Sequence, residues 1–174
     1  QKNEKNLGLV FLKKVMNLQV DLIINWMRVG FIHGVMNTDN MAISGETIDY
    51  GPCAFMDAYN PATVFSSIDH GGRYAFGNQP AIAQWNLTRL AETLLPLIDQ
   101  DESKSIQRAQ ETIGSFSELY KEKWLGMMRL KLGLLESNSG DEQLIVNLLE
   151  WMSINQADYT NTFRGLCQLE KPSG

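Results

Sequence analysis

Apolar residues recur at helical spacing in the first part of the chain. From Phe11 to Val29 they return every three or four residues, while polar residues such as Gln19 fall mainly on the other side of the helical wheel. Gly30 follows the last of them, and glycine often ends a helix because it adopts positive φ without a Cβ penalty. The pattern predicts an amphipathic helix that ends at Gly30.

The helical period disappears after Gly30, and two short strand-like runs follow. Met41–Ile43 and Thr47–Tyr50 are separated by Ser44-Gly45-Glu46, which is typical of a small β-hairpin. The stretch from Asp57 to Asn78 is rich in Asn, Pro, Ser, Gly and aromatic residues and has no clean period. We expect a long ordered loop there, of a kind that often carries function.

Helical patterns fill the rest of the chain. Asn78 is predicted to cap a helix that has Pro80 near its first turn and an apolar face made by Ile82, Trp85, Leu90, Leu94 and Leu97. Further helices are expected over 103–120 and 125–135, with two more that open at Asp141 and Asp158. The predicted fold is mainly α with one small β element. We expect all four tryptophans, Trp26, Trp85, Trp124 and Trp151, to lie in the core.

Composition and charge narrow the class of protein. With 174 residues and 44 % hydrophobic content, the chain can close one sizeable core. Its net charge of −5 argues against nucleic acid as a partner, because affinity for nucleic acid depends on clustered Lys and Arg. No apolar run approaches the roughly 20 residues that a membrane span requires. Cys53 and Cys167 are too few and too far apart for a disulfide framework or a zinc site, which favours a reducing compartment.

Polar groups that suit phosphate chemistry are concentrated in two neighbouring stretches, 33–41 and 48–52. Kinase-like folds place a loop of the type H-x-D-x-x-x-x-N after a long helix, and a metal-binding Asp follows a hairpin. The order is the same here. Asn40 and Asp49 are suitable ligands for a divalent metal, and the predicted hairpin would bring both to one end, beside Asp39.

One position departs from the ordinary kinase pattern. If Asn40 takes the place of the loop asparagine, the usual base aspartate falls on Val35, which cannot accept a proton. The nearest carboxylate is Asp39, which could serve as the base, point outward, or act as a second metal ligand. The alternative interpretation is that His33, Asp39 and Asn40 form a capped polar turn and that 49–52 is only a β-turn.

Longer strings give a resemblance to a known family. HGVMNTDNM at 33–41, TIDYGP at 47–52, DHGGRYAF at 69–76, NQPAIAQWNLTRL at 78–90 and DYTNTFRGL at 158–166 resemble, in family order, signature segments of the selenoprotein O (YdiU) family. Members of that family are similar to protein kinases in fold and are classed as pseudokinases. They bind ATP in a reversed orientation and transfer AMP to Ser, Thr or Tyr of client proteins.

The resemblance implies a role for each candidate residue. Asp39 would be the proton acceptor, Asn40 and Asp49 would hold Mg²⁺ (or Mn²⁺), and Asp49 would also lie close to ATP. It further implies a protein-kinase-like C-terminal lobe, with a core over 1–100 and a helical extension over 101–174. The family's N-terminal lobe is not represented, so we expect this fragment alone to be inactive. The expected compartment is the bacterial cytosol, or the mitochondrion if the source is eukaryotic.

Two other functions remain open from the residues. A conventional kinase-type phosphotransferase would share the metal site, although Val35 argues against it, and a non-catalytic helical interaction module could retain a degenerate metal loop. In the long loop, His70 and Arg73 flank two glycines. They could contact a phosphate or substrate, or they could simply anchor the loop by hydrogen bonds.

Overall fold

Helix α1 (Leu7–Val29) is the central element of the structure, a computed structural model that describes residues 6–167. It begins at Leu7 rather than Phe11, because Oδ1 of Asn6 accepts a hydrogen bond from the Leu9 backbone N–H at 3.0 Å and caps the first turn. It ends, as predicted, at Gly30, whose φ is 71°. A side chain at Gly30 would also crowd the ring of Tyr159, 3.0 Å away.

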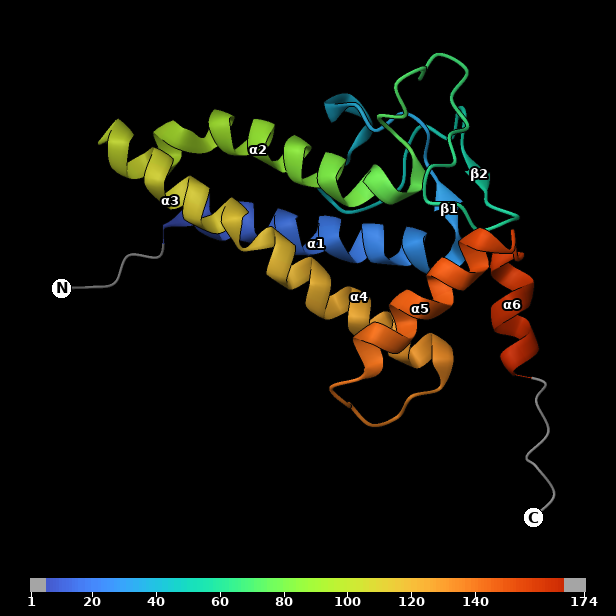
Figure 1. Ribbon diagram of the computed structural model, residues 1–174. Helices are drawn as coiled ribbons and strands as arrows, with labels where there is room; N and C mark the ends of the chain where they lie inside the picture. The colour runs from blue at the N-terminus through green and yellow to red at the C-terminus, as the bar shows by residue number, and fades with distance from the viewer. Residues whose placement is uncertain (1–5, 168–174) are drawn as a thin grey trace.

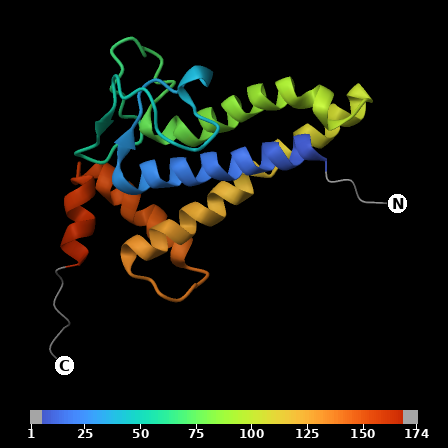
Figure 2. The ribbon, with the colours of Figure 1, turned by 180° about the vertical axis from the view of Figure 1, so that it is seen from behind.

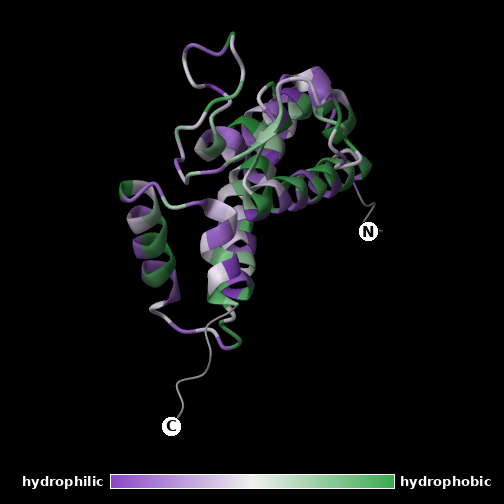
Figure 3. Ribbon diagram, turned by 90° about the vertical axis from the view of Figure 1, so that its right-hand side faces the viewer, coloured by the Kyte–Doolittle hydropathy of each residue, from purple (hydrophilic) through white to green (hydrophobic). Residues whose placement is uncertain are grey.

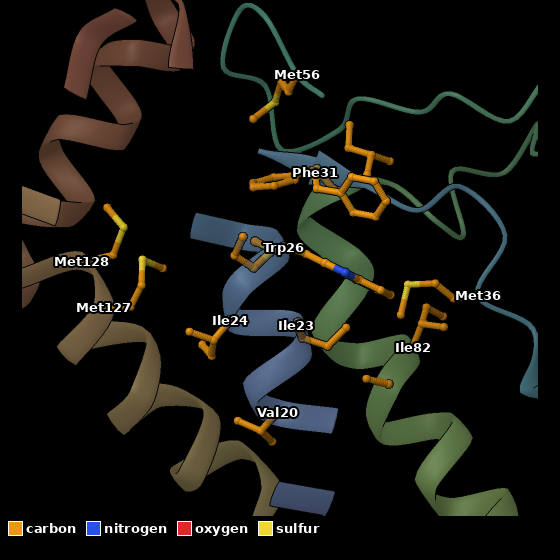
Figure 4. Close-up of a cluster of buried hydrophobic side chains, with 14 of the residues drawn as sticks. Val20, Ile23, Ile24, Trp26, Phe31, Met36, Met56, Ile82, Met127 and Met128 are labelled. Carbon is orange, nitrogen blue, oxygen red and sulfur yellow. The ribbon is translucent and has the colours of Figure 1, made fainter. Parts of the chain in front are cut away.

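Helices cover α1 on two sides (Figure 1). Helix α2 (Gln79–Ile98) packs along one side and α4 (Phe116–Leu132) along another. Figure 4 shows Ile23 pointing toward α2, whereas the next residue, Ile24, points toward α4. Both side chains are buried, and burying one such side chain contributes about 1.5–3 kcal/mol. The two sides of α1 therefore hold the helices together in one core.

The second half of the chain adds α3 (Glu102–Gly114), α5 (Asp141–Ile154) and α6 (Tyr159–Leu166). Helices α3 and α4 cross the face of α1 that is nearer the viewer in Figure 1 and farther in Figure 2. The prediction of one helix over 103–120 was wrong. The chain breaks at Ser115, whose Oγ donates to the carbonyl of Thr112 at 2.7 Å and closes the end of α3. Residues 168–174 of the predicted extension lie outside the described residues.

The mainly α fold is confirmed, and its helices are amphipathic, with both hydrophobic and hydrophilic positions (Figure 3). Helices α5 and α6 begin where they were predicted, and Oδ1 of Asp158 caps α6 by accepting from the Asn161 N–H at 2.6 Å. Trp26 is buried and Trp124 half-buried, but the prediction was wrong for the other two tryptophans: Trp85 is 43 % and Trp151 54 % exposed.

The β structure differs from the predicted hairpin. A two-stranded antiparallel sheet pairs β1 (Phe31–Ile32) with β2 (Ala54–Phe55). Between these strands the chain does reverse at 44–46, but the two arms share a single bridge, Met41 to Thr47. The hairpin was therefore predicted too long. The carbonyls of Ala42 and Ile48 accept hydrogen bonds from side chains instead of from a β ladder.

The long loop after β2 was predicted correctly, because neither helix nor strand forms from residue 57 until the short 3₁₀ helix η2 (Phe76–Asn78). Backbone hydrogen bonds close it, among them Gly77 N–H to the Pro61 carbonyl at 2.8 Å. Pro80 lies in the first turn of α2, as expected, and Asn78 occupies the N-cap position, but its side chain makes no capping hydrogen bond. Its Nδ2 donates to the Gly72 carbonyl at 2.8 Å and so holds the loop. Within 6–167, no helix is both long and apolar enough to cross a membrane.

Candidate functional site

The two polar stretches singled out from the sequence lie against each other. Gly34 has a φ of 86°, and a Cβ atom there would lie 3.0 Å from Cγ and 3.1 Å from the carbonyl oxygen of Pro52. Only glycine combines this backbone conformation with so close an approach. Gly34 thus allows the loop over 33–41, called here the catalytic loop after the role that the sequence predicts for it, to pack against the turn at 49–52.

His33 connects the same two stretches from inside the core. The side chain is fully buried. Its Nδ1 accepts a hydrogen bond from the Val35 N–H at 3.3 Å, so the ring proton of the neutral form resides on Nε2, which donates to the Ile48 carbonyl at 2.8 Å. Because Ile48 immediately precedes Asp49, one imidazole fixes both the start of the loop over 33–41 and the approach to the turn at 49–52.

Polar side chains from the two long helices fix the backbone around the catalytic loop. From α1, Gln19 Nε2 donates to the Ala42 carbonyl at 2.6 Å. From α2, Asn86 Nδ2 donates to the Met36 carbonyl at 2.9 Å. Gln79 accepts from the His33 N–H and donates to the Phe31 carbonyl, both at 3.0 Å, in the manner of a neighbouring strand. The loop is therefore held at several points along its length.

Sequence reasoning missed these anchoring residues. Gln19 was placed on the polar side of its helix, but its side chain is only 4 % exposed, and Asn86 is 8 % exposed. The sequence did contain one indication that these amides are buried: each lies one helical turn away from apolar residues that face the core. Such a residue needs a buried partner, since an unpaired buried amide is costly.

Asn40 lies at the end of a short 3₁₀ helix, η1 (Thr38–Asn40). Its Nδ2 donates to the carbonyl of Val35 at 3.0 Å. This bond fixes the side-chain orientation and directs the amide oxygen elsewhere, and within the described residues no donor bonds to that oxygen. A carbonyl oxygen held in one orientation is a suitable ligand for a hard divalent cation.

Asp39 and Asp49 both present exposed carboxylates. Asp49 has a φ of 54°, in the left-handed region that Asp enters more readily than most residues. The bridge between Met41 and Thr47 joins the two arms that carry these carboxylates, with Asp39 two residues before Met41 and Asp49 two residues after Thr47. Neither carboxylate has a salt-bridge partner in the described part of the chain.

The donor set fits a divalent metal that is held partly by phosphate oxygens. Residues 6–167 contain no group of three or more His, Cys, Asp or Glu side chains that could hold an ion on its own. Asn40 and Asp49 supply one amide oxygen and one carboxylate. Mg²⁺ is commonly bound through one or two protein groups, with substrate phosphates and water completing its shell. Both cysteines in the described residues are free thiols.

The long loop reaches the catalytic loop through Tyr74, whose hydroxyl donates to Oδ1 of Asn37. Upstream, the carboxylate of Asp69 accepts hydrogen bonds from the backbone N–H groups of Arg73 and Tyr74, at 2.9 and 2.8 Å. His70 and Gly71 in the same turn are exposed. The turn around Asp69 therefore positions the tyrosine that meets the catalytic loop.

A family model described as "Protein adenylyltransferase SelO" matches residues 1–174. Three relatives described as "Protein nucleotidyltransferase YdiU" are similar to this chain. The protein from Alcanivorax borkumensis is 57 % identical over 98 % of this chain and 35 % of its own length. The corresponding values are 60 %, 93 % and 34 % for Pelagibacter ubique, and 61 %, 94 % and 33 % for Brevibacillus brevis. The chain thus spans about a third of the length of these relatives. The family match and these identities together show that the chain belongs to the protein adenylyltransferase SelO family.

Proposed function

We propose that the whole protein containing this chain transfers AMP from ATP to Ser, Thr or Tyr hydroxyls of client proteins, with Mg²⁺ or Mn²⁺ as the metal. The observation that carries the proposal is the shared anchoring of Asn40 and Asp49. Asn40 is hydrogen-bonded to the carbonyl of Val35, and the residue before Asp49, Ile48, is hydrogen-bonded to His33. Val35 and His33 belong to the same loop and are themselves hydrogen-bonded to each other. The names of the relatives support nucleotidyl transfer as the reaction class.

In the proposed reaction, a client hydroxyl oxygen attacks the α-phosphorus of ATP. The bond between that phosphorus and the bridging oxygen breaks, pyrophosphate leaves, and Asp39 accepts the hydroxyl proton. The divalent ion would neutralise phosphate charge when bound. Asn40 and Asp49 would hold the ion, and Asp49 would also lie close to ATP. Asp39 is chosen as the proton acceptor because it is the nearest carboxylate, whereas Val35, at the usual base position, has no group that accepts a proton.

We further propose that the chain forms the C-terminal lobe of a kinase-like fold, with its core over 1–100 and a helical extension over 101–174. The order of a long helix, a catalytic loop, an Asp-containing turn, a long loop and a second long helix supports this assignment. Hydrophobic residues from both parts of the chain contribute to one large core cluster, which includes Ile23 and Met128.

The test is to incubate the whole protein with a protein acceptor and with ATP labelled at either the α or the γ phosphate. Label should reach the acceptor from the α position only. Asp49→Ala should abolish transfer without unfolding the protein, while Asp57→Ala, which removes another exposed carboxylate, should leave transfer unchanged. Transfer of the γ label would instead identify a conventional phosphotransferase.

A further inference from the structure

The middle of the chain carries very little positive charge. Between residues 29 and 103 the only Lys or Arg residues are Arg73, in the long loop, and Arg89, on α2. Both guanidinium groups stack on the same ring, with Cζ 4.8 Å (Arg73) and 5.2 Å (Arg89) from the centroid of Trp85. The three side chains are called here the Arg-Trp-Arg cluster. In a chain with a net charge of −5, it is a local concentration of positive charge.

The cluster lies beside the catalytic loop. Cζ of Arg73 is also 5.7 Å from the ring of Tyr74, the residue whose hydroxyl bonds to Asn37. Arg89 lines a pocket of about 270 Å³ together with Thr38 and with residues of both long helices. Asn37 and Thr38 are the two residues that precede Asp39. The cluster is therefore connected to the site next to the proposed proton acceptor, where a client hydroxyl must approach.

The cluster is accessible and has unused hydrogen-bonding capacity. Trp85 is 43 % exposed, and Arg73 is exposed and makes no ion pair with any residue in 6–167. Arg89 pairs with Glu92 at 2.7 Å, one turn away on the helix surface. A guanidinium stacked on a ring uses its flat face, and its N–H edge remains free for a carboxylate. Stacking also restricts each arginine before binding, which lowers the entropic cost of binding.

We propose that the Arg-Trp-Arg cluster binds carboxylate side chains of the client segment that carries the acceptor hydroxyl, so that the enzyme selects acceptors flanked by Glu or Asp. The inference rests on the proposed function and names its substrate class. An acidic peptide matches the cluster in charge. Under the proposed function, Asn40 and Asp49, neither of which belongs to the cluster, would hold the cation for the phosphates of ATP.

The experiment uses the whole protein and paired peptides that present one acceptor hydroxyl flanked by either Glu or Gln. The Glu peptide should have the higher kcat/KM. Arg73→Gln and Arg89→Gln should each lower kcat/KM for the Glu peptide about fivefold, the size expected for an exposed ion pair, while the value for the Gln peptide changes little. Arg164→Gln, which removes an exposed arginine on α6, is the matched control.

Two further variants separate binding from folding. Glu92→Gln removes the carboxylate that competes for Arg89, so it should raise kcat/KM for the Glu peptide. Trp85→Phe keeps a ring under the arginines and should retain most of the preference, which Trp85→Ala should reduce. A structural role alone would lower activity toward both peptides equally and would give no gain with Glu92→Gln.

Several outcomes would overturn the inference. If the active wild type has the same kcat/KM for the Glu and Gln peptides, the selection of acidic acceptors is contradicted, while the proposed AMP transfer still stands. A rise in the KM for ATP with both peptides in Arg73→Gln would identify the cluster as a nucleotide site. If the wild type labels no acceptor at all, the proposed function itself fails, which is a distinguishable result.

Discussion

Nδ2 of Asn40 donates a hydrogen bond to the carbonyl of Val35, with 3.0 Å between the two atoms. The bond joins the proposed metal ligand to the residue that stands where a kinase base would be expected. The backbone at 35 therefore helps to orient the amide, whatever side chain that position carries. Under the proposed function, the Asn40 amide can therefore be oriented as a metal ligand although the side chain at position 35 is not an acid.

Substitutions at Asn40 should separate ligation from orientation. Asn40→Ala removes the oxygen ligand, and we expect at least about a 100-fold loss of AMP transfer by the whole protein. Asn40→Asp keeps an oxygen but loses the donor to Val35, so a smaller loss, about 10-fold, and a higher Mg²⁺ requirement are expected. Transfer rates measured across a Mg²⁺ titration would show both effects.

The matched control is Asn25→Ala, because Asn25 is exposed on α1 and its Nδ2 makes the same kind of bond, to the Asp21 carbonyl at 2.9 Å. This variant should keep wild-type transfer. Removal of divalent ions by EDTA should abolish transfer in every variant, and Mn²⁺ or Mg²⁺ should restore it in the control. Wild-type rates for Asn40→Ala at limiting Mg²⁺ would exclude Asn40 as a ligand.

His33→Leu should destabilise the fold as well as the site. The substitution leaves the Ile48 carbonyl and the Val35 N–H without their partner, and each unsatisfied group costs about 1–3 kcal/mol when buried. We expect a loss of about 2–4 kcal/mol in the free energy of unfolding, measured by urea titration. The other histidine offers a direct comparison: His70 is exposed, and His70→Leu should change stability by less than about 0.5 kcal/mol. Equal effects of the two substitutions would contradict the proposed link.

Gly34→Ala should destabilise the contact between the catalytic loop and Pro52. The new Cβ would meet the proline at 3.0–3.1 Å in a backbone with positive φ, and the expected cost is about 2 kcal/mol. Pro52→Ala should recover part of this cost in the double variant, because the proline Cγ is one of the two atoms that clash. Gly71→Ala is the control, since nothing lies within 4 Å of a Cβ there and its φ is not positive. Unfolding curves of the four variants would decide.

The sequence predicted those parts of the fold that depend on local pattern. Helix α1 and its stop at Gly30 follow from apolar spacing and from glycine at positive φ, and α6 follows from the cap at Asp158. The sheet could not be predicted in this way, because each strand has two residues and the strands lie far apart in sequence. Pairing of that kind depends on the loops between the strands, not on the period within them.

Candidate residues were recognisable from the sequence, but their supports were not. Asp39, Asn40 and Asp49 stand out as oxygen ligands in a polar stretch, and their roles remain predictions. Gln19 was assigned to a polar surface because periodicity records residue type and not what a side chain reaches. Trp85 was assigned to the core for the same reason, although its ring is a surface platform for two arginines.

The last prediction concerns the stability of the helical part across alkaline pH. Nζ of Lys131, on α4, lies 3.9 Å from the ring centroids of both Tyr159 and Phe163 and donates to the Arg28 carbonyl. Burial, together with the nearby positive charge of Arg28, lowers the pKa of Lys131 to about 8. In the unfolded chain this amine keeps its proton until about pH 10.5.

Between these two pH values the unfolded state binds more protons than the folded state, so the free energy of unfolding contributed by Lys131 should rise as pH increases from 8 to 10.5. Below pH 8 the unfavourable contribution of the charged form should be constant. Lys131→Met keeps an unbranched side chain against the two rings and should remove this slope, while Lys13→Met, at an exposed position on α1, should keep it. Urea titrations of the three proteins at several pH values give the comparison. If the slope persists unchanged in Lys131→Met, it cannot arise from Lys131, and another group must titrate in this pH range.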